Sequence, residues 1–242
     1  MLNLAEKFCV VVPAAGVGKR MLTSCPKQYL TIANHTILEH TVQRLLSHEA
    51  IANVVIVLSA QDEYFATTSL ANNQAVRTVI GGKERVDSVL AGLKSLDAAQ
   101  QPWVLVHDAA RPCVRHQDIS RLIQYCLAND HGGILAMPVR DTMKQSQCGQ
   151  KIAKTLVRSQ MWHALTPQMF KTTELIQAIS AALANNITIT DESSAMEAFG
   201  YSSGLVNASG DNIKITQPED LQLAEFILNQ QKINLSSGAL CE

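Results

Sequence analysis

Val10-Val11-Val12-Pro13-Ala14-Ala15-Gly16-Val17-Gly18-Lys19-Arg20 stands near the start of the chain, and Pro26-Lys27 follows six residues later. The β-branched run predicts a buried strand, and the small residues after it predict a loop. Only Gly and Ala let backbone N–H groups come close to a triphosphate, and the long side chains of Arg20 and Lys27 can neutralise phosphoryl oxygens. Strand and loop together predict a nucleotide-binding segment.

Two common phosphate-binding patterns do not fit this loop. The dinucleotide pattern requires a third glycine where Met21 stands, and no Gly-Lys-Ser or Gly-Lys-Thr occurs in the chain. By themselves, Gly16 and Gly18 fit a simple turn equally well. The two cations favour a nucleotide loop, because a plain turn has no use for charges in these places.

Composition favours a single enzyme-sized domain. The chain has 242 residues, of which 47% are hydrophobic, and its formal net charge of -1 gives no broad basic surface for nucleic acid or an anionic membrane. The six cysteines include no Cys-x-x-Cys pair, which indicates reduced thiols. The apolar run before Pro13 is too short to span a bilayer and lacks a signal-peptide cleavage pattern. We therefore expect a cytoplasmic protein.

Strand-length apolar runs alternate with amphipathic helical patterns along the chain. Strands are predicted over residues 8–12, 54–58, 76–80, 103–106 and 134–137, and helices over residues 37–46, 86–96, 119–127, 173–183 and 218–228. Thr36 and Glu39 have the spacing of a capping box at the first helix. The alternation predicts an α/β fold with a mainly parallel sheet, helices on both faces, and ligands beyond the carboxyl ends of the strands. The domain is predicted to span residues 1–231, with a flexible tail over 232–242.

Residues 140–158 depart from this pattern, with polar and β-branched residues on both sides of Gln147-Cys148-Gly149-Gln150. The stretch predicts a hairpin without an apolar face that could be buried within its own domain. It could be a solvated loop or an arm that packs against another subunit. The regular alternation favours an arm, over about residues 139–159.

His107-Asp108-Ala109-Ala110-Arg111-Pro112 follows directly after the predicted strand 103–106. A carboxylate at this position can hold Mg2+ by one oxygen, while triphosphate oxygens and water complete the octahedron. Asp108 is therefore predicted to be a metal ligand. The alternative is that Asp108 caps the next helix and that Arg111 is its ion-pair partner.

Gly81-Gly82-Lys83-Glu84-Arg85-Val86-Asp87-Ser88 closes the third predicted strand and begins a helix. Paired glycines allow backbone groups to reach the edge of a base, and Ser88 adds a hydrogen-bonding side chain near the helix N-terminus. The segment could therefore select the nucleobase. A tight turn without a binding role is the alternative.

A series of ordered motifs resembles the 2-C-methyl-D-erythritol 4-phosphate cytidylyltransferase family over about residues 9–223. The motifs are Ala14-Ala15-Gly16-x-Gly18-x-Arg20, Pro26-Lys27-Gln28-Tyr29, Gly81-Gly82, His107-Asp108-Ala109-Ala110-Arg111-Pro112, Trp162-His163-Ala164-Leu165-Thr166-Pro167-Gln168, Thr190-Asp191-Glu192 and Asp211-Asn212-Ile213-Lys214. The resemblance implies a Rossmann-like fold and a homodimer whose subunits exchange a β-arm. It also implies Mg2+-dependent transfer of CMP from CTP to methylerythritol phosphate, in the non-mevalonate isoprenoid pathway.

The resemblance further implies a role for each matching residue. It assigns catalysis to Arg20 and Lys27, and Mg2+ binding to Asp108. The residues that would contact CTP are Ala14, Ala15, Gly16, Gly18, Gly82 and Ser88, and those that would contact the sugar-alcohol phosphate are Arg158, Lys214, Thr142, Arg111, Thr166 and Thr190. Because Arg158 lies on the arm, a neighbouring subunit should complete each site.

Two other functions fit parts of this pattern. A cytidylyltransferase for a pentitol phosphate such as ribitol 5-phosphate would look alike around the first loop, but the small Ala109-Ala110 pair favours the branched tetritol. A nucleotide sensor without turnover would not need Arg20, Lys27 and Asp108 together.

Overall fold

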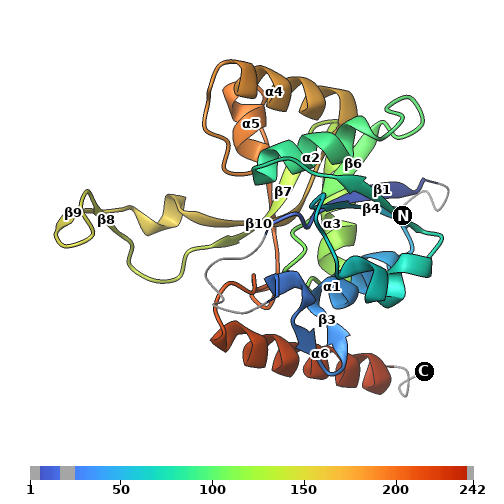
Figure 1. Cartoon of the computed structure of the whole chain (residues 1–242). Coiled ribbons are helices and arrows are strands. Elements are labelled where there is room, and N and C mark those ends of the chain that lie inside the picture. Colours follow the sequence, from blue (N-terminus) through green and yellow to red (C-terminus); the bar gives the residue numbers. More distant parts are fainter. Residues whose placement is uncertain (1–5, 17–24, 239–242) are drawn as a thin grey trace.

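A seven-stranded sheet forms the centre of the molecule in a computed structural model, which describes residues 6–16 and 25–238. Neighbouring strands pair in parallel, except that the third strand in the sheet runs antiparallel to both of its neighbours. The order is β11 (Gly204–Asn207), β7 (Gly133–Pro138), β10 (Trp162–Lys171), β6 (Trp103–Val106), β1 (Phe8–Pro13), β4 (Ile51–Leu58) and β5 (Val76–Ile80) (Figure 1). The predicted α/β class with a mainly parallel sheet is confirmed.

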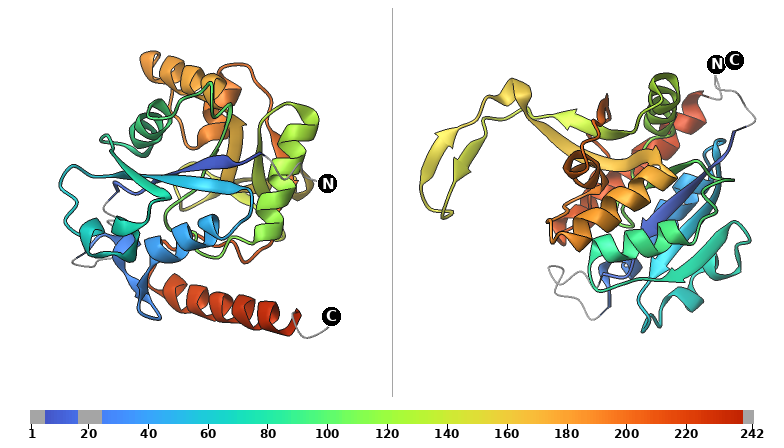
Figure 2. Two further views of the ribbon diagram at one scale, coloured as in Figure 1. Left: turned by 90° about the vertical axis from the view of Figure 1, so that its right-hand side faces the viewer. Right: turned by 90° about the horizontal axis from the view of Figure 1, so that it is seen from above.

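Helices cover both faces of this sheet (Figure 1, Figure 2). On one face lie α1 (Ile37–Leu46) and α3 (His116–Asn129), and on the other lie α2 (Arg85–Lys94), α4 (Thr172–Ala184) and α5 (Glu192–Ala198). Alternate residues of β1 join the two cores: Val10 and Val12 pack with α1 and α3, whereas Cys9 and Val11 pack with α2 and α4. A strand covered on both faces needs an apolar side chain at every position, which explains the unbroken valine run.

The predicted helices and strands are confirmed, most with small shifts at their ends. The strand 103–106 and the helix 37–46 have the predicted bounds. The capping box at the start of α1 is present, since Thr36 Oγ1 accepts the Glu39 N–H at 3.1 Å and Glu39 Oε2 accepts the Thr36 N–H at 2.8 Å. The described chain also contains short elements: β2 (Thr31–Ile32), β3 (His35–Thr36), and the 3-10 turns η2 (Lys27–Tyr29), η3 (Phe65–Thr67), η4 (Ser69–Asn72) and η5 (Arg158–Gln160).

The last helix, α6 (Glu219–Gly238), is longer than predicted. It continues past residue 228, so residues 232–238 of the predicted flexible tail lie in a helix. The reason is tertiary contact: Leu228 is buried in the core beneath α6, and Gln231 Nε2 donates to the Cys113 carbonyl at 2.9 Å.

Apart from the short elements, β10, α5 and β11 have no counterpart in the prediction. β10 is a central strand, yet it contains Pro167, a residue that patterns of central strands exclude. The structure accommodates this proline at an irregularity between Ala164 and Gln168, where the pairing with β7 shifts register. The sequence analysis predicts no strand over these residues, so β10 is an addition to the predicted sheet.

The strand directions gather several loops at one edge of the sheet. β1, β5 and β6 are parallel members of the sheet, so the loops that follow Pro13, Ile80 and Val106 leave from their carboxyl ends on the same side. β10 runs the opposite way beside β6, with Gln168 opposite Val106, and this register brings Thr166 beside Asp108. The antiparallel strand thus adds a fourth segment to the edge where ligands are expected.

A hairpin projects from the body of the protein, as Figure 1 and Figure 2 both show. Its strands are β8 (Lys144–Ser146) and β9 (Ile152–Thr155), and all of their residues are exposed. The hairpin agrees with the alternation found in residues 140–158. Its contact with a second subunit stays a prediction.

Candidate active site

Two cavities open at the carboxyl edge of the sheet and share a wall. The larger has a volume of about 300 Å³ and the smaller about 250 Å³, and Arg85, Asp108 and Lys214 line both. The larger is also lined by Pro13, Ala15, Gly16, Lys27, Gln28, Gly82, Lys83, Glu84, Ser88, Ala109 and Ala110, and the smaller by Arg111, Ala164, Leu165, Thr166, Gln168, Thr190 and Asp191. Most predicted site residues of the described chain therefore meet here, sorted into the predicted nucleotide and second-substrate groups.

The glycine pair after β5 is required by the packing of the larger cavity. A Cβ on Gly81 would lie 2.6 Å from Ser88 Oγ, and one on Gly82 would collide with the side chain of Asp87. Ser88 is buried, and its hydroxyl donates to the Glu84 carbonyl at 3.2 Å. The turn consequently brings backbone, rather than side chains, to the cavity wall at Gly82.

The loop after β1 forms the facing part of this wall. Ala15 and Gly16 line the cavity, and Ala14 is buried just before them, its N–H donating to the Val57 carbonyl at 2.8 Å. Gly18 and Arg20 lie outside the described residues, so their predicted roles stay predictions.

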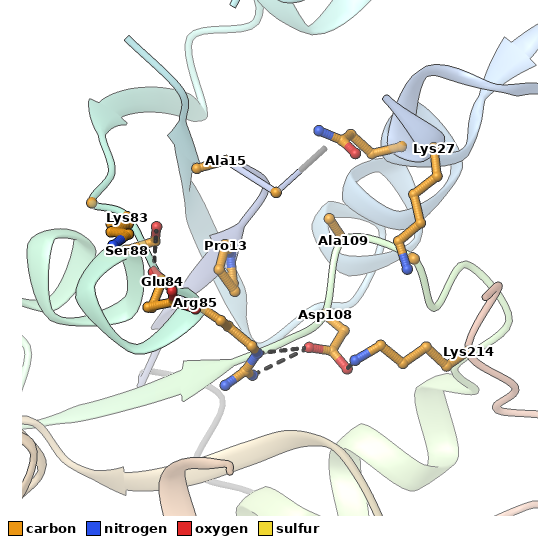
Figure 3. Close-up of a pocket in the computed structure, with 14 residues that line it drawn as sticks. Pro13, Ala15, Lys27, Lys83, Glu84, Arg85, Ser88, Asp108, Ala109 and Lys214 are labelled. Carbon is orange, nitrogen blue, oxygen red and sulfur yellow. Dashed lines mark hydrogen bonds and ion pairs between the residues drawn. The ribbon is translucent and has the colours of Figure 1, made fainter. Parts of the chain in front are cut away.

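Lys27 reaches the larger cavity from a firmly anchored turn. Its neighbour Gln28, which belongs to a quoted motif but was assigned no role, is buried and donates from Nε2 to the Ala14 carbonyl at 2.7 Å. On the other side, Tyr29 donates its hydroxyl to Asp62 Oδ2 at 2.6 Å. Lys27 Nζ itself donates to the Ile215 carbonyl at 2.9 Å, which directs the ammonium group toward the segment that carries Lys214 (Figure 3).

Asp108 binds cations from three directions. Arg85 Nη2 lies 3.2 Å from Oδ1. Lys214 Nζ lies 2.9 Å from Oδ2, and Arg111 Nε lies 3.3 Å from the same oxygen. Figure 3 shows Arg85 and Lys214 approaching the carboxylate from opposite sides. Burial alone would raise the pKa of the Asp108 carboxyl, but the three cations outweigh it and hold this pKa well below its usual range.

The geometry excludes one of the two interpretations of Asp108, and its role as a metal ligand stays a prediction. The next helix, α3, begins at His116 with Arg115 as its N-cap residue, so the interpretation of Asp108 as a helix cap is wrong. The ion pair with Arg111, which accompanied that interpretation, is present. Asp108 forms this ion pair and also lies on the wall of both cavities.

At this site the protein could supply only one ligand to a Mg2+ ion, the Asp108 carboxylate. Within the described residues, no group of three or more His, Cys, Asp and Glu side chains could hold a metal ion. Mg2+ commonly accepts one carboxylate together with substrate phosphates and waters. Asp108 is a hard oxygen donor on the cavity wall, so it fits that single-carboxylate role for an ion that arrives with a triphosphate.

Thr166 links the smaller cavity to the Asp108 loop through its hydroxyl. The Asp108 N–H donates to Thr166 Oγ1 at 3.0 Å, and this hydroxyl lies 3.1 Å from His107 Nδ1. His107 Nε2 lies 3.0 Å from the Arg111 carbonyl, an acceptor, so Nε2 carries the proton and Nδ1 accepts from Thr166. Burial lowers the pKa of His107 to about 4, which agrees with this neutral tautomer. Thr166 Oγ1 thus uses its proton for His107 and one lone pair for the Asp108 N–H. Its second lone pair remains, so toward a substrate this hydroxyl can accept a hydrogen bond but cannot donate one.

Asn212 fixes the segment that carries Lys214, although the prediction gave it no role. It is buried, and its Nδ2 donates to the Thr166 carbonyl at 2.8 Å. The backbone carbonyl of Asn212 accepts a hydrogen bond from Arg111 Nη1 at 2.7 Å. Both contacts join segments that are distant in sequence, so only the folded arrangement reveals them.

The prediction also missed the ion pair between Arg85 and Glu192. Arg85 Nη1 and Nη2 donate to Glu192 Oε1 and Oε2 at 2.7 Å and 3.2 Å. Burial lowers the pKa of Arg85, but Glu192 and Asp108 outweigh it and raise this pKa above its ordinary value. The available signal was the position of Arg85 at the start of a helix, directly after the Gly81-Gly82 turn.

Two predicted substrate residues lie away from the cavities of their own chain. Thr142 precedes β8 and Arg158 is in η5, and both are exposed. Arg158 Nη1 donates to the Arg140 carbonyl at 2.7 Å, a contact within the base of the hairpin. Neither residue lines either cavity.

Comparison with known proteins finds relatives that match this chain over nearly its whole length. A family model described as 2-C-methyl-D-erythritol 4-phosphate cytidylyltransferase matches residues 8–230. A protein of that name from Colwellia psychrerythraea is 58% identical over 236 residues, covering 94% of this chain and 97% of the relative, and one from Vibrio vulnificus is 56% identical, covering 96% and 99%. A crystal structure of the Francisella tularensis protein of the same name has a TM-score of 0.79 at 33% identity, covering 92% of this chain and all of that chain.

Proposed function

The chain belongs to the 2-C-methyl-D-erythritol 4-phosphate cytidylyltransferase family, and we propose that it transfers CMP from CTP to 2-C-methyl-D-erythritol 4-phosphate. The products are 4-(cytidine 5′-diphospho)-2-C-methyl-D-erythritol and pyrophosphate, in the non-mevalonate route to isoprenoids. The observation that carries the proposal is the pair of cavities that meet at Arg85, Asp108 and Lys214. Such a pair suits two substrates whose phosphates react with each other.

The reaction requires the two substrates to be positioned and their negative charge to be stabilised, and it does not require a general base. A phosphate monoester has a second pKa of about 6, so the sugar-alcohol phosphate is already an anion at neutral pH. Its oxygen attacks the α-phosphorus of CTP, and the bond from that phosphorus to the bridging oxygen of the β-phosphate breaks. Negative charge gathers on the phosphoryl oxygens as the two anions meet, and fixed cations stabilise it.

The cations that we assign to this task are Arg20 and Lys27. Support for Lys27 comes from its anchored turn and its position on the wall of the larger cavity. Arg20 is assigned by family resemblance. We assign CTP contacts to Ala14, Ala15, Gly16, Gly18, Gly82 and Ser88, and contacts with the second substrate to Lys214, Arg111, Thr166, Thr190, Thr142 and Arg158.

Asp108 would hold Mg2+ by one carboxylate oxygen. The ion, when bound, would neutralise triphosphate charge and assist departure of pyrophosphate. Lys214 and Arg111, which share the same carboxylate oxygen, can turn to the substrate phosphate as the carboxylate is occupied. The protein's part in this is to keep an anion and several cations within reach of both cavities.

The projecting hairpin supports a homodimer. Ile152 and Val157 are large apolar side chains that are exposed on it or at its base, 66% and 62% respectively, and a second subunit could cover them. If that subunit's arm reached the cavities, its Thr142 and Arg158 would complete the substrate site.

We also assign the enzyme to the cytoplasm. Cys9, Cys113 and Cys126 are buried as free thiols, which suits a reducing compartment. Among the described residues, the helices are too short or too polar to cross a membrane.

The test is a measurement of pyrophosphate release with CTP and two acceptors in parallel. We expect turnover with 2-C-methyl-D-erythritol 4-phosphate, and much slower turnover with ribitol 5-phosphate, because the family to which the chain belongs is named for the branched tetritol phosphate. Ala109 and Ala110 line the larger cavity and not the smaller one, so their size does not carry this expectation. Equal or faster turnover with ribitol 5-phosphate would reassign the substrate.

A further inference from the structure

Arg85 lines both cavities, yet no role in the proposed reaction falls to it. It is the first residue of α2, directly after the turn that forms the wall of the larger cavity. Its side chain is 31% exposed, whereas that of its partner Glu192 is 2% exposed. The guanidinium thus faces the cavities, and Glu192 supports it from the protein interior.

The two carboxylates hold the guanidinium differently. Glu192 accepts from Nη1 and Nη2 through both of its oxygens, a bidentate pair that fixes the plane of the group. Asp108 meets the guanidinium through Oδ1 alone, which lies 3.2 Å from Nε and 3.2 Å from Nη2, so Nη2 faces both carboxylates and Nε faces Asp108. Because Asp108 also binds Lys214 and Arg111, it keeps cationic partners if Arg85 exchanges it for another anion. The Nε edge of Arg85 can therefore exchange Asp108 for a substrate phosphate.

The position of Arg85 coincides with the place where the reacting groups must meet. If each cavity admits one substrate, the attacking phosphate and the α-phosphorus approach each other across the shared wall. The described residues that line both cavities are Arg85, Asp108 and Lys214. Asp108 is an anion, so Arg85 and Lys214 are the cations which that junction offers among the described residues.

We propose that Arg85 is a catalytic residue that donates hydrogen bonds to the phosphoryl group during its transfer, and that Glu192 is the positioning residue that holds it there. The inference rests on the proposed function. As the oxygen of the sugar-alcohol phosphate bonds to the α-phosphorus, the bond to the bridging oxygen breaks and its electron pair leaves with pyrophosphate. No proton moves in this step. Arg85 stabilises the charge on the non-bridging oxygens through its Nε edge, while Glu192 keeps the other edge in place.

The first experiment compares Arg85→Ala with the wild-type chain and with Arg77→Ala. Arg77 is a matched control: it donates to the carbonyl of Ser95, the C-cap residue of α2, at 3.0 Å, but it is exposed and lines neither cavity. We expect Arg85→Ala to lower kcat by about 100-fold or more, as for loss of one preorganised donor. Millimolar guanidinium should restore part of kcat in this variant alone. Arg77→Ala should keep the wild-type kcat with and without guanidinium.

The second experiment addresses Glu192. In Glu192→Gln one acceptor oxygen remains but the charge and the bidentate geometry are lost, so we expect kcat to fall by about 10-fold with little change in KM for CTP. The double variant Arg85→Ala/Glu192→Gln should have the kcat of Arg85→Ala, because a positioning residue has no effect once the group it positions is gone.

The outcomes separate the inference from the proposed function. An active wild-type chain with an Arg85→Ala variant of normal kcat and lowered Tm would show a purely structural ion pair and overturn the inference alone. A folded, impaired Arg85→Ala that guanidinium does not stimulate would also overturn it. If Arg85→Ala does not fold, Arg85→Lys is measured instead, and an unchanged kcat there would contradict the inference. A wild-type chain without cytidylyltransferase activity would overturn the proposed function and the inference with it.

Discussion

Lys214 Nζ lies 2.9 Å from Asp108 Oδ2, although the two residues come from opposite halves of the chain. Asp108 follows β6 in the middle of the sheet, and Lys214 lies on the irregular segment between β11 and α6. The contact closes the wall between the two cavities. An anion shared among Lys214, Arg85 and Arg111 keeps mutually repelling cations together before any substrate phosphate is present.

Asp108→Asn should therefore impair catalysis strongly. The substitution removes the anion that organises the cations and the carboxylate assigned to Mg2+, so we expect kcat to fall by about 100-fold or more and the Mg2+ requirement to rise. Pyrophosphate release measured over a range of Mg2+ concentrations checks both effects, with circular dichroism to confirm folding. Asp97→Asn, at an exposed loop aspartate, is the control. An Asp108→Asn variant with unchanged kcat and Mg2+ dependence would contradict the assignment.

Lys27→Ala should lower kcat far more than it weakens CTP binding. An ammonium group that interacts most strongly with the charge of the transition state contributes to kcat rather than to ground-state affinity. Turnover and calorimetric titration with CTP separate the two quantities. Lys94→Ala, which removes an exposed lysine at the end of α2, should change neither. Normal turnover in Lys27→Ala would remove this residue from the mechanism.

Thr166 offers a test of the hydrogen-bond chain through His107. Thr166→Val would leave the Asp108 N–H and His107 Nδ1 without their partner, and each unpaired buried group costs about 1–3 kcal/mol. We expect a lower free energy of unfolding in urea and a large loss of kcat. Thr166→Ser retains the hydroxyl and should preserve most of both. If serine and valine behave alike, the hydroxyl is not what holds the Asp108 loop.

The loops that line the larger cavity were predictable because their signals are local. A buried strand followed by Ala15 and Gly16, or by Gly81 and Gly82, has a characteristic composition, and parallel strands place such loops at one edge. The anchored position of Lys27 was less accessible, since it depends on a hydrogen bond between Gln28 and the Ala14 carbonyl.

The junction between the cavities was not predictable, because it arises from contacts among segments far apart in the chain. Arg85 and Glu192 belong to α2 and α5, and no periodicity tells which of many charges will pair once these helices pack on the sheet. β10 was likewise absent from the predicted strands, and with it the antiparallel register that brings Thr166 beside Asp108.

Glu39 should contribute to stability in a pH-dependent way. Burial alone would raise the pKa of its carboxyl, but hydrogen bonds from Ser69 and Thr36 outweigh burial and lower it from 4.5 to about 2. A carboxyl whose pKa is lower in the folded chain stabilises it above pH 4.5 and loses this contribution as pH falls toward 2. We expect Glu39→Gln to cost about 3 kcal/mol at pH 7 and progressively less below pH 4.5.

Urea unfolding between pH 3 and 7 measures this difference between wild type and Glu39→Gln. Glu49→Gln, at an exposed position three residues beyond α1, is the control and should follow the wild-type curve. A cost for Glu39→Gln that stays constant over the whole pH range would show that the Glu39 hydrogen bonds act through shape rather than charge.

The predicted exchange of arms can be tested by mixing two inactive variants. Lys27→Ala damages the cavity of its own chain, whereas Arg158→Ala damages the arm, whose Arg158 lines neither cavity of that chain. If the arm completes the partner's site, each mixed dimer contains one intact site, formed by the cavity of the Arg158→Ala protomer and the arm of its partner. Random exchange of subunits should then restore about one quarter of wild-type activity, since half of the dimers are mixed and half of their sites are intact. Recovery is measured as pyrophosphate release after equilibration, with each variant alone as the control. If Arg158 acted within its own chain, no site in the mixture would be intact, and activity would not recover at any ratio of the two variants.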